Sequence, residues 1–273
     1  MLNKIKLKQI LEKEKIIPKK KLGQNFIFDF NVLNKIVKNI LPIKDHTVIE
    51  IGPGPGGLTR SILEQSPKEI ILIEKDKSFK NILTLLLKEF PKIKSTLLIA
   101  DFMEVDVINF IKPDTKILSN LPYYVSTQIL LKILPLDKNI KEVIFTFQKE
   151  VAERIISKPN NKNYSRLSVI AQSVCNITLA QKLPAKIFYP EPKIDSTVLK
   201  FVKKKNIIIK DFTKLKTVTK KAFNKRRKKI KNSLKEIKNI SIYLQQLNIN
   251  EQSRPENISV DAYCNLANTI KEI

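Results

Sequence analysis

The sequence has little cysteine, histidine and tryptophan. Its 273 residues contain two cysteines, one histidine and no tryptophan. Cys175 and Cys264 lie far apart and neither belongs to a C-x-x-C pair, which argues against a disulfide framework and against a thiolate zinc site. We therefore expect a protein of a reducing compartment, the cytoplasm, and we expect no bound metal.

Long apolar runs are also absent. No run approaches the roughly 18 residues that a membrane-spanning helix needs. Residues 1–15 lack the apolar stretch of a signal peptide and already contain Glu12 and Glu14. The sequence therefore predicts a protein that is neither secreted nor embedded in a membrane.

Acidic residues are scarce relative to basic ones. Lys and Arg number 51 against 26 Asp and Glu, which gives a formal net charge of +25. Residues 1–22 carry eight cations and two anions, residues 201–240 carry sixteen and two, and the other 211 residues have a net charge of only +5. A run of charge can be a solvated lysine face, but its concentration in two segments favours a polyanionic partner.

The apolar residues follow an alternating strand and helix pattern. Strand-like, β-branched runs occur at 47–51, 69–74, 95–100, 116–120 and 141–147, with helical stretches between them. Nearly continuous apolar strands separated by helices are typical of a parallel sheet that is covered on both faces. Two more strand candidates, 176–183 and 195–202, leave no room for a crossover helix and must be antiparallel. We predict an α/β, Rossmann-like fold with a mostly parallel seven-stranded sheet and an antiparallel last strand.

The strand pattern ends at about residue 206. Residues 213–237 and 259–273 have the spacing of amphipathic helices and predict a small all-α C-terminal domain. We expect three parts, which are a lysine-rich N-terminal extension over 1–18, the α/β domain over 19–205 and the helical domain over 206–273.

A glycine-rich loop follows the first of these strands. Gly52, Gly54 and Gly57 match G-x-G-x-x-G between a strand and a helix, where backbone N–H groups can approach a ligand. Glu74 ends the next strand, where a ribose-binding acid belongs. Alone, this pattern suggests a dinucleotide, or a structural turn without a ligand.

Polar residues at the next two strand ends favour S-adenosylmethionine over a nicotinamide cofactor. Asp101 ends the third strand and can accept a hydrogen bond from an adenine amino group; Asn120, Leu121, Pro122 and Tyr123 follow the fourth. An exocyclic adenine amine is a poor nucleophile because its lone pair is delocalised into the ring. The Asn120 side-chain carbonyl and the Leu121 backbone carbonyl can accept both amine hydrogens and direct the lone pair at a methyl group. Pro122 fixes the chain direction, and Tyr123 offers a face for stacking.

The sequence resembles the ribosomal RNA small-subunit adenine N6,N6-dimethyltransferases. Eight segments carry the resemblance, in the order of that family, from about residue 19 to the C-terminus; residues 1–18 lie outside it. They are LGQNF (22–26), EIGPG (50–54), NLPY (120–123), FQKEVAER (147–154), YSRLS (164–168), FYPEPKIDST (188–197), FNKRR (223–227) and ENIS (256–259).

The resemblance implies transfer of two methyl groups from S-adenosylmethionine to N6 of each of two adjacent adenines in the terminal hairpin loop of small-subunit rRNA. It implies a methyltransferase domain over 19–205 and an rRNA-docking domain over 206–273. The implied cofactor-binding residues are Asn25, Ile27, Gly52, Glu74 for the ribose, Asp101 for the adenine, and Asn120. The implied catalytic residues are Asn120, Leu121, Pro122, Tyr123 and Phe188, with Tyr123 and Phe188 sandwiching the target base.

The basic run over Lys225, Arg226, Arg227, Lys228 and Lys229 is expected to grip RNA phosphates rather than to read bases. The expected partner is small-subunit rRNA within an immature small ribosomal subunit, bound by a cytoplasmic monomer. Two alternatives stay open: an adenine N6 methylase that acts on another RNA or on DNA, and a protein that acts mainly as a ribosome-assembly factor.

Overall fold

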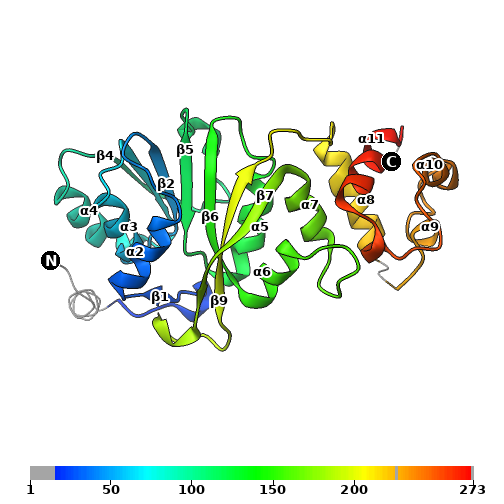
Figure 1. Cartoon of the computed structure of the whole chain (residues 1–273). Helices are drawn as coiled ribbons and strands as arrows, with labels where there is room; N and C mark the ends of the chain where they lie inside the picture. Colours follow the sequence, from blue (N-terminus) through cyan, green and yellow to red (C-terminus); the bar gives the residue numbers. More distant parts are fainter. Residues whose placement is uncertain (1–15, 225–226, 272–273) are drawn as a thin grey trace. The chain divides into compact units, whose positions relative to one another are not determined.

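The computed structural model describes residues 16–224 and 227–271, which form two compact units (Figure 1). The first unit is the chain up to Lys149 together with Thr178–Val202, and the second is Glu150–Ile177 together with the chain from Lys203. Residues 150–177 therefore pack with the C-terminal helices. The domain boundaries expected at 18 and 205 stay predictions.

A seven-stranded sheet has the strand order β4-β3-β2-β5-β6-β9-β7. β2 pairs in parallel with β3 and β5, β3 with β4, and β5 with β6, while β9 runs antiparallel to β6. The predicted mostly parallel sheet with an antiparallel last strand is confirmed. The strands are β2 Thr47–Ile51, β3 Glu69–Glu74, β4 Lys94–Ile99, β5 Thr115–Ser119, β6 Ile140–Gln148, β7 Cys175–Leu183 and β9 Ser196–Lys203.

Burial explains why the strand sequences are so apolar. Every residue of β2, β3 and β5 is buried, because these strands lie inside the sheet and are covered on both faces. Strand β4 lies at the sheet edge and exposes Lys94 and Ser95. Side chains from α2, α3 and α4 join alternate strand residues such as Val48 and Leu72 in one core. The helices of this unit are α2 Phe30–Lys38, α3 Gly57–Leu63, α4 Lys80–Lys88 and α5 Tyr123–Ile133, with short 3-10 turns η1 Lys20–Leu22, η2 Lys77–Phe79, η3 Val107–Phe110 and η4 Ala185–Ile187.

A second, two-stranded sheet joins two distant segments of the first unit. Strand β1, Phe26–Ile27, pairs antiparallel with β8, Phe188–Tyr189. The Phe26 ring also packs edge-on against Phe79, with 5.6 Å between ring centroids. The sheet therefore ties the chain before α2 to the segment before β9.

The second unit is helical and is built around three aromatic rings. Phe223 lies 6.1 Å from Tyr164 and 5.7 Å from Tyr263, measured between ring centroids. The Tyr164 hydroxyl donates to the Ile258 carbonyl at 3.0 Å, and the Tyr263 hydroxyl donates to the Pro255 carbonyl at 2.9 Å. These bonds satisfy two phenol groups inside an otherwise apolar core.

Helix α6, Lys149–Ile156, belongs to this unit from Glu150 onward. The other helices of the unit are α7 Arg166–Val174, α8 Phe212–Asn224, α9 Ile230–Ser233, α10 Ile240–Gln246 and α11 Val260–Thr269, with the 3-10 turn η5 Pro255–Asn257. The helical C-terminal region is confirmed. Within the stretch 213–237, α8 ends at Asn224 and α9 covers Ile230–Ser233. Within the described ranges, no helix is long and apolar enough to cross a membrane.

Candidate active site

A cavity in the first unit lies at the carboxyl ends of β2, β3, β4 and β5. This is the edge at which open α/β sheets bind ligands. All six side chains or loop positions predicted to bind the cofactor line the cavity, namely Asn25, Ile27, Gly52, Glu74, Asp101 and Asn120. The predicted catalytic residues Leu121 and Pro122 line it as well.

The glycine loop after β2 follows a path that needs glycine. Gly52, Gly54 and Gly56 have φ values of 65°, 55° and 85°, a region that side chains with a Cβ atom rarely adopt. A Cβ atom on Gly54 would lie 2.8 Å from the Phe26 ring, so the loop and β1 pack too closely for a side chain. A Cβ atom on Gly52 would meet nothing within 4 Å, which leaves the backbone there open to a ligand.

Glu74 is fixed between the glycine loop and the end of β3. Its side chain is buried; one carboxylate oxygen accepts from the Gly54 N–H at 2.9 Å and the other from the Asp76 N–H at 2.7 Å. Burial raises the pKa of Glu74, and these backbone hydrogen bonds oppose that rise. A carboxylate oriented in this way retains lone pairs that can accept from the two hydroxyls of a ribose.

Asp101 is more exposed and is paired with a lysine. Its carboxylate forms an ion pair with Lys75 Nζ at 2.6 Å and accepts from the Met103 N–H at 2.9 Å. The hydrogen bond from Lys75 holds the pKa of Asp101 below its usual range. Asp101 is therefore an ionised acceptor at the cavity rim.

Asn120 is oriented by the N-terminal segment. Its Nδ2 donates to the backbone carbonyl of Asn25 at 3.1 Å, while the Asn25 side chain donates to the Gly23 carbonyl at 3.1 Å. Because the amide nitrogen of Asn120 is engaged there, its carbonyl oxygen lies on the other side of the planar amide group. Pro122, two residues after Asn120, has a φ of −58° and is the N-cap of α5.

The two predicted catalytic aromatics, Tyr123 and Phe188, do not line the cavity. The Tyr123 hydroxyl is within 2.7 Å of Ser196 Oγ, and burial raises the pKa of this phenol. Phe188 is only 4% exposed, because β8 pairs with β1 and places Phe188 opposite Ile27. Tyr124, which is 51% exposed, does line the cavity. The sandwich formed by Tyr123 and Phe188 stays a prediction.

Glu50 lines the cavity and was not among the predicted site residues. It is 1% exposed and accepts from the Thr59 hydroxyl at 2.7 Å. Burial raises the pKa of Glu50 to about 8. The signal for it in the sequence is an acidic residue inside the apolar strand TVIEI, directly before the glycine loop.

The described residues contain no cluster of His, Cys, Asp and Glu that could hold a metal ion. Cys175 and Cys264 are both buried as free thiols, and burial raises the pKa of each. The groups that converge on the cavity are carboxylates, amides and backbone N–H groups. Such groups can bind a nucleoside that carries a charged substituent.

Comparison with known proteins identifies the family. Residues 17–272 match the family described as ribosomal RNA adenine dimethylase. The chain belongs to this family. It is 41% identical over 264 residues to "Ribosomal RNA small subunit methyltransferase A" of Ehrlichia canis (strain Jake), covering 94% of this chain and 98% of that protein. A protein of the same name from Buchnera aphidicola subsp. Baizongia pistaciae is 38% identical over 266 residues, covering 96% and 100%.

Solved structures share the fold of this adenine dimethylase family member. A dimethyladenosine transferase from Plasmodium falciparum superposes with a TM-score of 0.72 at 23% identity, covering 86% of this chain and 94% of that one. The 23S rRNA methyltransferase ErmE superposes with a TM-score of 0.67 at 18% identity, covering 90% and 100%. These likenesses support the Rossmann-like sheet and its helical extension.

Six of the eight segments that resemble the dimethylase family gather in two places. LGQNF, EIGPG and NLPY supply residues that line the cavity. YSRLS, FNKRR and ENIS instead supply Tyr164, Phe223 and Ile258 to the aromatic core of the second unit. For these three residues the structure shows a packing role.

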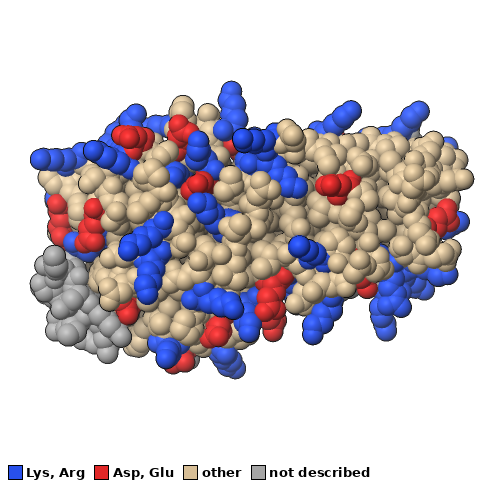
Figure 2. Space-filling view, viewed as in Figure 1, with Lys and Arg blue, Asp and Glu red and all other residues tan. Residues whose placement is uncertain are grey.

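The predicted RNA-binding run lies partly within the described chain. Lys225 and Arg226 lie outside the described residues; Arg227, Lys228 and Lys229 are exposed between α8 and α9. In Figure 2, Lys and Arg side chains project from the visible surface of both units, so positive charge is not confined to this run. Phosphate contact by these cations stays a prediction.

Proposed function

We propose that this dimethylase transfers methyl groups from S-adenosylmethionine to N6 of two adjacent adenines in the 3′-terminal hairpin loop of 16S rRNA, during small-subunit biogenesis. The observation that carries the proposal is the convergence of Glu74, Asp101 and Asn120, from three strand ends, on one cavity. The products are N6,N6-dimethyladenines. The cytoplasm is the proposed location and a monomer the proposed state.

The cavity suits the nucleoside part of S-adenosylmethionine. Glu74 accepts from the ribose hydroxyls, and Asp101 accepts from the adenine amino group. Gly52 presents backbone with open space beside it, while Asn25 and Ile27 cover the cavity from the N-terminal segment. When bound, the cofactor supplies an electrophilic methyl group on a sulfonium sulfur.

Asn120 orients the target amine. Its Nδ2 is engaged with the Asn25 carbonyl, so its carbonyl oxygen accepts from the target N6, together with the backbone carbonyl of Leu121. The N6 lone pair then points at the methyl carbon. N6 would receive the methyl group of bound S-adenosylmethionine, and the electron pair of the S–C bond would remain on sulfur. The methylated N6 would carry a positive charge and would release its proton to water, so a strong general base is unnecessary.

The target adenine must leave its stack to reach the cavity. Tyr123, the first residue of α5, and Phe188 on β8 are proposed to hold its ring. Since Phe188 is buried here, this role requires the β1–β8 sheet to shift when RNA binds. RNA loops suit such capture because their bases are already free to stack on aromatic side chains.

Primer extension tests the proposal. A reverse transcriptase read across the 3′-terminal hairpin should stop at two adjacent adenines only after small subunits have been incubated with this protein and S-adenosylmethionine, because dimethylated N6 blocks Watson–Crick pairing. The Asn120→Ala variant and a reaction without cofactor are the controls. A strong stop elsewhere in the RNA would favour another RNA substrate, and tight subunit binding without any stop would favour an assembly factor.

A further inference from the structure

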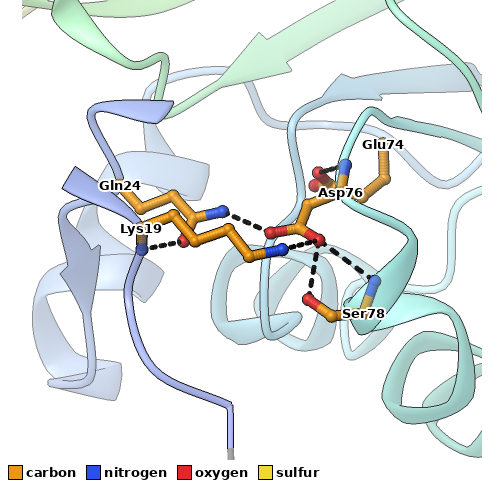
Figure 3. Close-up of polar contacts among 5 residues, drawn as sticks. All are labelled: Lys19, Gln24, Glu74, Asp76 and Ser78. Carbon is orange, nitrogen blue, oxygen red and sulfur yellow. Dashed lines mark hydrogen bonds and ion pairs between the residues drawn. The ribbon is translucent and has the colours of Figure 1, made fainter. Parts of the chain in front are cut away.

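Asp76 is a buried carboxylate two residues beyond Glu74 that does not itself line the cavity. It is 4% exposed and accepts four hydrogen bonds (Figure 3). The donors are Lys19 Nζ at 2.8 Å, Gln24 Nε2 at 2.9 Å, the Ser78 N–H at 3.1 Å and Ser78 Oγ at 2.7 Å. Burial alone would raise the pKa of Asp76, but these donors lower it to about 2. The carboxylate is therefore charged at neutral pH.

The donors to Asp76 come from two separate segments, the N-terminal segment and Ser78 just beyond β3. Lys19 and Gln24 belong to the N-terminal segment, and the Lys19 N–H also donates to Gln24 Oε1 at 2.7 Å. This segment continues directly into Asn25 and Ile27, which line the cavity. Just beyond β3, the Asp76 N–H donates to Glu74 Oε1 at 2.7 Å, as Figure 3 also shows.

We propose that Asp76 is a positioning residue for cofactor binding, which fastens the segment Lys19–Ile27 to the end of β3. It thereby sets Asn25 and Ile27 at a fixed place relative to Glu74 before the cofactor arrives. Ordering a binding segment in advance removes part of the entropy cost of binding. The inference rests on the proposed function in taking S-adenosylmethionine as the ligand.

The chemistry of the cluster requires a carboxylate at this position. Lys19 and Gln24 donate to opposite oxygens of Asp76, and Ser78 donates twice more. An asparagine offers one acceptor oxygen and an NH2 group, so one of the donors from the segment would face another donor. Asp76→Asn therefore loosens the segment while it keeps the volume of the side chain.

The first experiment is isothermal titration of S-adenosylmethionine into the full chain and its Asp76→Asn variant. We expect the dissociation constant to rise about tenfold, with faster hydrogen exchange over residues 19–27. At saturating cofactor, kcat should stay much closer to the parental value than KM does. Unchanged affinity with unchanged exchange would overturn the inference.

Glu69 provides a matched control at the other end of the same strand. Its side chain is 8% exposed and pairs with Lys94 and Lys112; burial would raise its pKa, but the hydrogen bonds from these lysines lower it. Glu69→Gln removes a comparable charge far along β3 from the cavity and should leave cofactor affinity unchanged. An equal loss of affinity in Glu69→Gln would show that general destabilisation explains the Asp76 result.

Exchanging the amide and the carboxylate between positions 24 and 76 tests the hydrogen bond between these two side chains. Gln24→Glu places two carboxylates together and should weaken cofactor binding at least as much as Asp76→Asn. In the double variant Gln24→Glu with Asp76→Asn, the asparagine can donate to the new glutamate, so affinity should recover relative to Gln24→Glu alone. A double variant as weak as the summed single effects would overturn the inference. If the parental protein fails to bind S-adenosylmethionine at all, the proposed function falls first and this inference falls with it.

Discussion

The cavity of the first unit and the aromatic core of the second unit are both built from segments that resemble one enzyme family, yet they differ in kind. Around the cavity, the oxygens of Glu74, Asp101 and Asn120 keep lone pairs that the contacts orienting these side chains do not use. In the aromatic core, Tyr164 and Tyr263 are fully buried and both hydroxyls are bonded to backbone carbonyls. A segment that is typical of the family can therefore contribute either to the candidate active site or to core packing. Polar groups that keep unused lone pairs indicate the first role, and polar groups whose hydrogen bonds are made within the protein indicate the second.

The largest effect is expected in the aromatic core. Tyr164→Ala removes a fully buried ring and should lower the free energy of unfolding by about 3–5 kcal/mol. Thermal and urea denaturation of the full chain would measure this loss. Tyr164→Phe is the milder companion, since it leaves the Ile258 carbonyl without its donor at a cost of about 1–3 kcal/mol. If Tyr164→Phe abolished methylation while stability stayed parental, Tyr164 would belong to the chemistry and the contrast would fail.

Asn120→Ala should act in the opposite way, on the reaction rather than on stability. The amide carbonyl matters most as the amine rehybridises in the transition state, so we expect the single-turnover rate to fall by about 100- to 1000-fold. The measurement uses saturating small subunits and labelled cofactor. Phe188→Ala should instead weaken capture of the base by about 1–3 kcal/mol and recover partly at high subunit concentration. A parental rate for Asn120→Ala would contradict the proposed mechanism.

Much of the fold follows from the sequence because its strands are buried on both faces. The predicted ranges 47–51 and 69–74 are β2 and β3 to the residue, since one apolar run ends at a loop of glycine and proline and the other at charged residues. The two-residue strands β1 and β8 could not be predicted, because two residues carry no periodicity. The non-helical residues 227–229 before α9 could not be predicted, because lysine-rich sequence has high helix propensity throughout.

The candidate site was predictable in part for a similar reason. Residues at the ends of successive parallel strands must meet at one edge of the sheet, which placed Glu74, Asp101 and Asn120 together. The burial of Phe188 depends on β1, which lies about 160 residues earlier in the chain. The pairing of Lys19 with Asp76 spans 57 residues and leaves no pattern in the sequence.

Glu74→Ala should weaken cofactor binding, with an effect intermediate in size among these predictions. It tests whether the polar side chains of the cavity, unlike those of the aromatic core, bind a ligand. The loss of a charge-assisted hydrogen bond to the ribose is worth about 1.5–3 kcal/mol, so the dissociation constant of S-adenosylmethionine should rise roughly ten- to a hundredfold. Calorimetry measures it, with Glu69→Ala as the control on the same strand. Because Glu74 also accepts from the Gly54 N–H, part of the loss reflects a looser glycine loop. Unchanged cofactor affinity, or tight NAD binding by the parental protein, would contradict the assignment of Glu74.

The smallest effect is expected for the basic run of the second unit, where each phosphate contact contributes little alone. Alanine at Lys225, Arg226, Arg227, Lys228 and Lys229 should weaken small-subunit binding and reduce the slope of log affinity against log salt by roughly 0.7–0.9 per lost contact. Filter binding across several salt concentrations measures the slope, while calorimetry should show parental cofactor affinity.

The control variant carries alanine at five exposed lysines of the first unit: Lys44, Lys80, Lys88, Lys92 and Lys138. Both variants lose five charges, so a net-charge effect flattens both slopes equally, whereas direct phosphate contact flattens only the first. Equal slopes would mean that the run is a solvated surface, and that RNA docking by this unit must be sought on its other cations.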